Sequence, residues 1–187
     1  QNYSCLRNSI LTISDKFTHA DKSLPGNTYE DNNDFKWPSD TSKNEPNFVE
    51  WTKIVSSFES GRDLEYTDGE GKKRKTTTPS EFKRDGLNKL EEIKNTGAGS
   101  AAYFIAGAAY WANTHDIRGS DWTLKPEKQR PGLRVKTYVL DVNERKDSND
   151  SNKRWNSQLF LTAKYGGFTD INGDGNPYTG KDGDHAN

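Results

Sequence analysis

Oxygen-bearing side chains alternate along a short segment in the last twenty residues of the sequence. Asp170, Asn172 and Asp174 occupy the first, third and fifth positions of the segment DINGDG, and Gly175 occupies the sixth. A hard cation such as Ca²⁺ takes about six to eight oxygen ligands at about 2.3–2.6 Å, and a glycine at the sixth position lets the backbone fold sharply around it. The spacing therefore predicts a calcium-binding loop.

The ligand set departs from that of an EF-hand at one position. The twelfth residue, a bidentate glutamate in that motif, is Lys181 here. A helix-loop-helix unit is therefore not expected, and the Asn176 carbonyl with Asp182 or Asp184 is the candidate to complete the shell. The same residue types also favour ordinary turns, because Asp and Asn side chains bond to nearby backbone. Three alternating oxygen side chains are more than a turn requires, which favours calcium.

The histidines and the cysteine form no recognisable catalytic motif. None of His19, His115 and His185 lies in a His-Glu-x-x-His zinc motif or near a Gly-x-Ser-x-Gly nucleophile. His115-Asp116 has the form of an oriented general base, but its position at the end of an apolar helix favours an interaction with the helix dipole. Cys5, the one cysteine, favours a structural or partner-seeking role. We therefore expect a protein that is not an enzyme.

Two other functions fit the sequence. A secreted hydrolase could hold the calcium as a structural ion. A carbohydrate-binding module could use exposed tryptophans, for which the candidates are Trp37, Trp51 and Trp122.

The charge balance gives no reason to expect nucleic acid or an acidic membrane as a partner. The 27 basic residues nearly cancel the 28 acidic ones, for a formal net charge of −1. The basic run 72–75 is flanked by Asp, Gly and Glu on one side and by threonines on the other, which predicts a solvated hairpin tip. No apolar stretch is long enough to span a membrane. If the protein is exported, these residues are a mature or excised piece of it.

Two strands and a long loop are predicted from the apolar pattern. Residues 6–14 form a short apolar strand, with Ile10, Leu11 and Ile13 expected to be buried. Residues 133–142 alternate two faces and give the clearest strand in the chain. Residues 16–47 are rich in Asp, Asn, Ser, Pro and Gly without a sustained period, and are expected to be loop.

Four helices and a hairpin are also predicted. The helical segments are 50–58, with Trp51, Ile54, Val55 and Phe58 on one face, 79–93, about 100–113, and the segment from Leu159 to a stop at Gly166-Gly167. The segment 100–113 is apolar nearly all round, so we expect it to be buried with its alanines and Gly107 against another element. Residues 64–66 are expected to pair with the threonines around Thr77. The order of elements favours a layered α/β domain with a mostly parallel sheet.

Four blocks of the sequence together resemble a known family. They are CLRN with ISD in residues 5–15, YFIAGAAYWANTHDIR in 103–118, TYVLDVN in 137–143, and AKYGGF with DINGDG in 163–175. In this order they resemble the von Willebrand factor A-like region of the PilC/PilY proteins, which are large exported factors of type IV pili. The fourth block is the most specific of them.

The resemblance implies a single domain, residues 1–187, that forms the later part of a von Willebrand factor A-like fold. It further implies loop insertions at 16–47 and 61–78 and a calcium-type loop at 168–187. The Asp-x-Ser-x-Ser motif of the family's adhesion site does not occur in this sequence, and Asp15, which matches a late aspartate of that site, is followed by Lys16. Asp15 is therefore expected to cap a loop. The sheet is expected to be incomplete, with its apolar edge strand covered by a loop, another chain or another segment.

The function implied by the resemblance is a non-enzymatic adhesion and pilus-biogenesis module. It implies export to the pilus tip, cell surface or outer membrane. The implied partners are minor pilin subunits, a host or surface receptor, and the remaining part of the same polypeptide.

Overall fold

The computed structural model describes residues 7–14, 46–92, 94–96, 99–117, 133–142 and 155–179. Within them it has three α-helices, a short 3₁₀ helix and six strands. In chain order these are β1 (Asn8–Ser14), α1 (Phe48–Ser60), β2 (Glu65–Thr67), β3 (Lys73–Lys75), the 3₁₀ helix η3 (Ser80–Phe82), β4 (Lys94–Thr96), β5 (Gly99–Ala101), α2 (Phe104–Thr114), β6 (Val135–Asp141) and α5 (Gln158–Gly167). The α/β class predicted from the sequence is confirmed.

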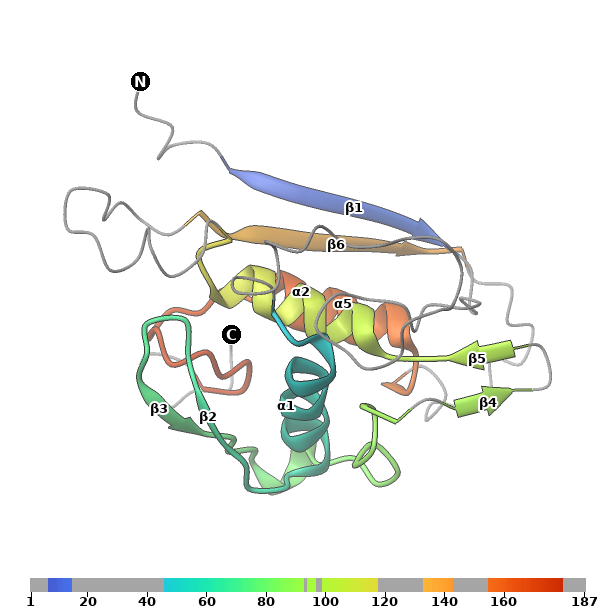
Figure 1. The fold of residues 1–187 in the computed structure, drawn as a ribbon, viewed down its shortest axis with the longest axis horizontal. Coiled ribbons are helices and arrows are strands. Elements are labelled where there is room, and N and C mark those ends of the chain that lie inside the picture. Colours follow the sequence, from blue (N-terminus) through green and yellow to red (C-terminus); the bar gives the residue numbers. More distant parts are fainter. Residues whose placement is uncertain are drawn as a thin grey trace.

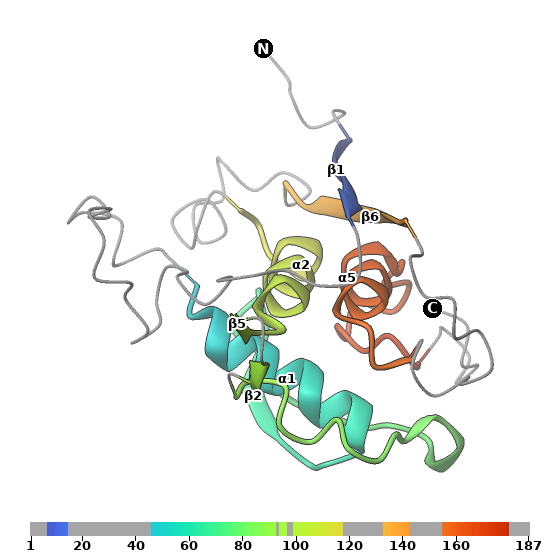
Figure 2. The same cartoon turned by 90° about the vertical axis from the view of Figure 1, so that its right-hand side faces the viewer.

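The described elements form three layers. β1 and β6 make a parallel two-stranded ribbon, with α2 and α5 side by side beneath it (Figures 1 and 2). α1 packs on α2 at the side away from the ribbon. The hairpins β2–β3 and β4–β5 are antiparallel, so the expectation of a mostly parallel sheet holds only for β1–β6 among the described strands. No helix in the described ranges is long and apolar enough to cross a membrane.

The pairing of β1 with β6 confirms that the two predicted strands share a parallel sheet. The register places Leu11 opposite Tyr138 and Ile13 opposite Leu140. The predicted burial of β1 is wrong, because Ile10, Leu11 and Ile13 are 52%, 65% and 60% exposed. The physical reason is that α2 and α5 pack under β6, while β1 lies at the margin of this layer.

An aromatic cluster forms the core between α1, α2 and α5. The ring of Phe58 is fully buried, and its centroid lies 6.1–6.4 Å from those of four tyrosines, namely Tyr66, Tyr110, Tyr165 and Tyr178. Aromatic rings bury large apolar areas, so they supply the core of a chain that is poor in aliphatic residues.

Small residues let the layers approach closely, as the sequence predicts for α2. A Cβ on Gly107 would lie 2.5 Å from the backbone nitrogen of Thr52 in α1. A Cβ on Gly166 of α5 would lie 2.6 Å from Cβ of Thr137 in β6. Gly166 therefore serves close packing, and α5 continues through it to Gly167.

The helix predicted over residues 50–58 is confirmed and extends to Phe48–Ser60. The Asn47 side chain accepts hydrogen bonds from the backbone N–H groups of Val49 and Glu50, which caps the first turn. Gly61 follows the last turn with φ of 68°, a left-handed conformation that favours glycine.

The helix predicted over residues 79–93 is wrong. Only η3 forms, and turns follow it. The Thr78 hydroxyl donates to the Phe58 carbonyl (2.7 Å) and does not cap a helix. Leu87 and Leu90 are nevertheless buried, because Ser56 of α1 donates to the Leu87 carbonyl and accepts from the Leu90 N–H. Contacts with α1 therefore determine the conformation of this segment, although its apolar residues have the spacing of a helix.

The boundaries of two other predicted elements also change. α2 begins at Phe104, because residues 99–101 pair with 94–96 as a hairpin. The hairpin predicted around the glycine-rich tip forms, but its second strand is the basic run Lys73–Lys75, with Tyr66 opposite Arg74, and not the predicted threonines around Thr77. Its basic side chains have local partners, since Lys72 pairs with Glu70 and Lys75 with Asp63.

Candidate metal-binding loop

The Asp170 carboxylate organises the predicted metal loop from within. Its Oδ1 accepts hydrogen bonds from the backbone N–H groups of Gly173 (2.9 Å) and Asp174 (3.1 Å), and its Oδ2 accepts from Gly175 (3.0 Å). Gly173 and Gly175 have φ of 74° and 73°, in the left-handed region where glycine carries little steric cost. The two glycines thus let the backbone wrap around one carboxylate.

Asn172 and Asp174 converge on the same turn. The Asp174 N–H donates to Asp170 Oδ1 and to Asn172 Oδ1, each at 3.1 Å, so these two side-chain oxygens lie beside one backbone atom. Asn172 Nδ2 donates to Asp174 Oδ2 (3.0 Å), which also accepts from the Thr179 hydroxyl (2.6 Å). The structure therefore gathers the three side chains that the alternating pattern singled out.

The Asn176 side chain anchors the loop to the hairpin. Its Nδ2 donates to the Thr77 carbonyl (2.9 Å), its Oδ1 accepts from the Tyr178 N–H (2.9 Å), and the residue is 6% exposed. Both ends of its side-chain amide are thus used in hydrogen bonds within the protein. Only its backbone carbonyl remains a candidate ligand.

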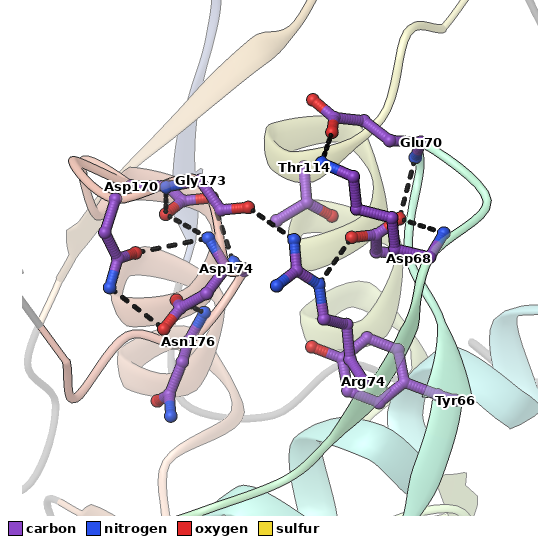
Figure 3. Close-up of polar contacts among 12 residues, drawn as sticks. Tyr66, Asp68, Glu70, Arg74, Thr114, Asp170, Gly173, Asp174 and Asn176 are labelled. Carbon is purple, nitrogen blue, oxygen red and sulfur yellow. Dashed lines mark hydrogen bonds and ion pairs between the residues drawn. The ribbon is translucent and has the colours of Figure 1, made fainter.

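Arg74 clamps the hairpin to the loop, as Figure 3 shows. Its Nε donates to Asp68 Oδ2 (2.7 Å), and its Nη2 donates to the Gly173 carbonyl (2.9 Å). Asp68 Oδ1 accepts from the N–H groups of Glu70 and Lys72, which closes the hairpin tip. The guanidinium therefore joins two segments that are 99 residues apart.

The Asp68–Arg74 pair is ionised at neutral pH. Burial alone would raise the pKa of Asp68, but hydrogen bonds from Arg74 and from the N–H groups of Lys72 and Glu70 outweigh it and lower that pKa. The hydrogen bond to Asp68 raises the pKa of Arg74. A permanent positive charge thus stands beside Asp174 and partly offsets the two carboxylates of the loop.

Tyr110 of α2 holds the loop from its inner side. Its hydroxyl donates to the Gly175 carbonyl (2.8 Å) and lies 3.2 Å from the Tyr66 hydroxyl. A Cβ on Gly175 would lie 3.2 Å from the Tyr110 hydroxyl. Gly175 is therefore required both by its backbone conformation and by this close approach.

The features that hold the loop were not predicted from the sequence. The basic run was interpreted as a solvated tip, and Tyr110 as a residue of an apolar helix. No local pattern marks either residue, because the partners of Arg74 and Tyr110 lie 99 and 65 residues away.

Several residues predicted as site candidates lie outside the described part of the chain. They are Cys5, Asp15, His19, Trp37, Trp122, Lys181, Asp182, Asp184 and His185. Among the described residues, no three His, Cys, Asp or Glu side chains gather to hold a metal ion. The described loop offers two carboxylates and one amide, so a full oxygen shell requires backbone carbonyls, water or the residues that follow.

His115 and Trp51 pack edge to face and do not form the predicted alternative sites. Their ring centroids are 4.4 Å apart. Trp51 is half-buried, which differs from the exposed platform that a carbohydrate module needs. Burial lowers the pKa of His115 to about 4, so its ring is neutral and does not interact with the helix dipole as a cation.

One curated protein with a related sequence is the type IV pilus biogenesis factor PilY1 homolog of Xylella fastidiosa (strain Temecula1 / ATCC 700964). It is 29% identical to this chain over 169 residues, which are 89% of this chain and 12% of that protein. No family model and no solved structure matches. The chain is thus distantly related to a pilus biogenesis factor and spans 12% of the length of that relative.

Proposed function

We propose that this chain belongs to a type IV pilus biogenesis factor and acts in it as a non-enzymatic module. The observation that carries the proposal is the 29% identity over 89% of the chain to a protein named as such a factor. The sequence blocks that resemble the PilC/PilY proteins support the same proposal.

The proposed fold is the later part of a von Willebrand factor A-like domain. The parallel pair β1–β6 with helices α2 and α5 beneath it supports this assignment, because parallel strands joined through helices are the unit of such layered domains. The proposed location is the exported pilus tip or the cell surface. The proposed partners are minor pilins, a surface receptor and the rest of the polypeptide.

Calcium is the proposed ion of the loop, bound by Asp170, Asn172 and Asp174 with the Asn176 carbonyl and Asp182 or Asp184. The donor set fits a hard cation, since it consists of carboxylate, amide and carbonyl oxygens. Asn172 Nδ2 now donates to Asp174 Oδ2, and an ion held by both residues would replace this donor. A Cβ on Gly173 would have no neighbour within 4 Å, so the loop is open at this point.

Calcium titration by calorimetry tests this part of the proposal. We expect binding in the range of about 10⁻⁴–10⁻³ M that is typical of extracellular modules. Asp170→Asn and Asp174→Asn should each weaken it by about tenfold or more, because each removes a negative ligand. Asp63→Asn is the matched control, since Asp63 is an exposed carboxylate paired with Lys75. Absence of binding at millimolar calcium, or equal weakening by the control, contradicts the calcium assignment.

Deletion of the gene that encodes this polypeptide tests the proposed role. We expect fewer surface pili and reduced twitching or attachment, restored by the gene in trans. The control is deletion followed by complementation with Asp63→Asn, which should restore the wild type. A deletion strain with normal pili, motility and attachment contradicts the proposal. A purified protein that turns over a substrate would instead support the hydrolase alternative.

A further inference from the structure

Two glycines of the metal loop are each held by a side chain from another element. The Gly173 carbonyl accepts from Arg74 Nη2 of β3 (2.9 Å; Figure 3), and the Gly175 carbonyl accepts from the Tyr110 hydroxyl of α2 (2.8 Å). Both glycines have positive φ, and glycine has more backbone freedom than any other residue. The external donors therefore restrain the loop at the two positions where its backbone is intrinsically the most variable.

Both donors are connected to the hairpin β2–β3. Tyr110 has one hydroxyl proton and donates it to Gly175, so the Tyr66 hydroxyl, 3.2 Å away, donates its own proton to Tyr110. Tyr66 and Arg74 are cross-strand partners, so their side chains lie on the same face of the hairpin. This face is turned to the loop, whereas the alternate residues are exposed, namely Glu65, Thr67, Lys73 and Lys75. The hairpin thus reaches the loop through one cross-strand pair.

The hairpin and the proposed ion use different atoms of the loop. The proposed ligands are the side chains of Asp170, Asn172 and Asp174 and the Asn176 carbonyl. The donors bind the carbonyls of the two glycines that alternate with these ligands. An ion therefore has no need to displace either donor. A loop that is already restrained loses less conformational freedom when it binds, which favours binding.

We propose that Arg74 and Tyr110 are positioning residues of the ion site, and that ion binding and docking of the hairpin stabilise each other. Such coupling is reciprocal, so donors that raise the ion affinity imply an ion that holds the hairpin more firmly. The hairpin depends on support of this kind, because its strands have only three residues each and an isolated two-stranded hairpin is marginally stable. In the ion-bound protein the exposed face of the hairpin is thus held in a fixed orientation.

Calcium titration of two conservative variants tests the positioning role, which rests on the proposed calcium binding. Arg74→Lys keeps the positive charge, which by itself disfavours a cation, but it loses the planar fork that binds Asp68 and Gly173 together. Tyr110→Phe removes only the hydroxyl that donates to Gly175. We expect each variant to bind calcium about fivefold or more weakly than the wild type.

Arg62→Lys and Tyr103→Phe are the matched controls. Arg62 donates to Ser57 and to the Asn88 carbonyl, and Tyr103 donates to the Asn156 carbonyl. Each control thus changes the same kind of contact in a different part of the protein, and it should bind calcium as the wild type does. Equal affinity of the variants and their controls overturns the positioning role and leaves the calcium assignment intact. Absence of binding by the wild type overturns both.

Hydrogen exchange in the wild type measures the reciprocal effect without a change in the hairpin. The N–H groups of Glu70 and Lys72 donate to Asp68 Oδ1 and close the hairpin tip, so their exchange reports on its order. Saturating calcium should slow this exchange about fivefold or more and leave the capped first turn of α1, residues 49–50, unchanged. In Asp174→Asn the same calcium concentration should slow it less. If calcium binds to the wild type but does not slow exchange at the tip, the proposed coupling is wrong.

Discussion

Replacing Glu59 by alanine is expected to lower the free energy of unfolding by about 3–5 kcal/mol, because it removes one partner of a buried ion pair. Glu59 is 2% exposed, and its Oε1 accepts from Lys164 Nζ (2.5 Å), the Tyr165 hydroxyl (2.7 Å) and the Tyr178 hydroxyl (2.9 Å). These donors come from α5 and from the segment after the metal loop. One carboxylate therefore joins α1 to both.

The expected loss of stability arises because the groups that bind Glu59 lose their partner. Burial lowers the pKa of Lys164, and the charge of Glu59 and its hydrogen bond oppose this effect. Without Glu59, the ammonium is a buried charge with no counter-ion, or it loses its proton at a cost. The two tyrosine hydroxyls also lose their acceptor.

Urea unfolding followed by tryptophan fluorescence measures this effect. Glu65→Ala is the matched control, because Glu65 is exposed on the hairpin and its loss should change stability by about 0.5 kcal/mol or less. The double variant Glu59→Ala/Lys164→Met should be more stable than Glu59→Ala alone, since it also removes the unpaired charge. A single variant as stable as the control contradicts the interpretation, and so does a double variant that is less stable than both single variants.

Lowering the pH from 7 to 4 is expected to remove about 3 kcal/mol of stability through His115 alone. Burial is the main cause that lowers its pKa from 6.5 to about 4, and nearby Arg134 acts in the same direction. The hydrogen bond to the Trp111 carbonyl and the charge of Asp68 oppose it. Between these two pKa values the unfolded chain binds a proton that the folded chain does not, so stability is present above about pH 6.5 and falls as the pH drops.

The hydrogen bonds of the ring fix its tautomer, whereas burial keeps it neutral. Nδ1 lies 3.2 Å from the Trp111 carbonyl and 2.9 Å from the Thr114 hydroxyl, which donates its own proton to the Tyr110 carbonyl. Both neighbours of Nδ1 therefore act as acceptors, which places the proton on Nδ1. The ring stacks on Trp111 and makes a T-shaped contact with Trp51, which keeps water from it.

Chemical denaturation at several pH values compares the wild type with His115→Gln, which has no titrating ring. The variant is expected to be less stable at pH 7 and to lose about 3 kcal/mol less than the wild type between pH 7 and 4. His19 and His185 are present in both proteins, so the difference isolates His115. Equal losses in the two proteins, or an NMR titration of the His115 ring near pH 6.5, contradict this prediction.

Local sequence patterns were sufficient to predict the elements that are stabilised by residues close to them in the sequence. α1 follows from the spacing of its apolar residues and is capped by Asn47, two and three residues from the N–H groups it binds. The existence of the hairpin β2–β3 follows from its glycine-rich tip, although not its second strand, and β6 follows from its alternation. The turn of the metal loop also follows, because Asp170 bonds to residues three to five positions away.

Long-range contacts decided the features that the sequence did not predict, since no local pattern encodes a partner many residues away. The segment 79–93 has the spacing of a helix, but Ser56 of α1 binds its backbone, and turns allow Leu87 and Leu90 to be buried. Arg74 belongs to a run that reads as solvated, yet it clamps the loop through Gly173. Glu59 is a charged residue at the end of a helix, and only the packing of α5 and Tyr178 around it makes it a buried anchor. The apolar composition of β1 specified a strand, while its exposure was decided by where α2 and α5 lie, because burial depends on the neighbouring layer and not on the strand itself.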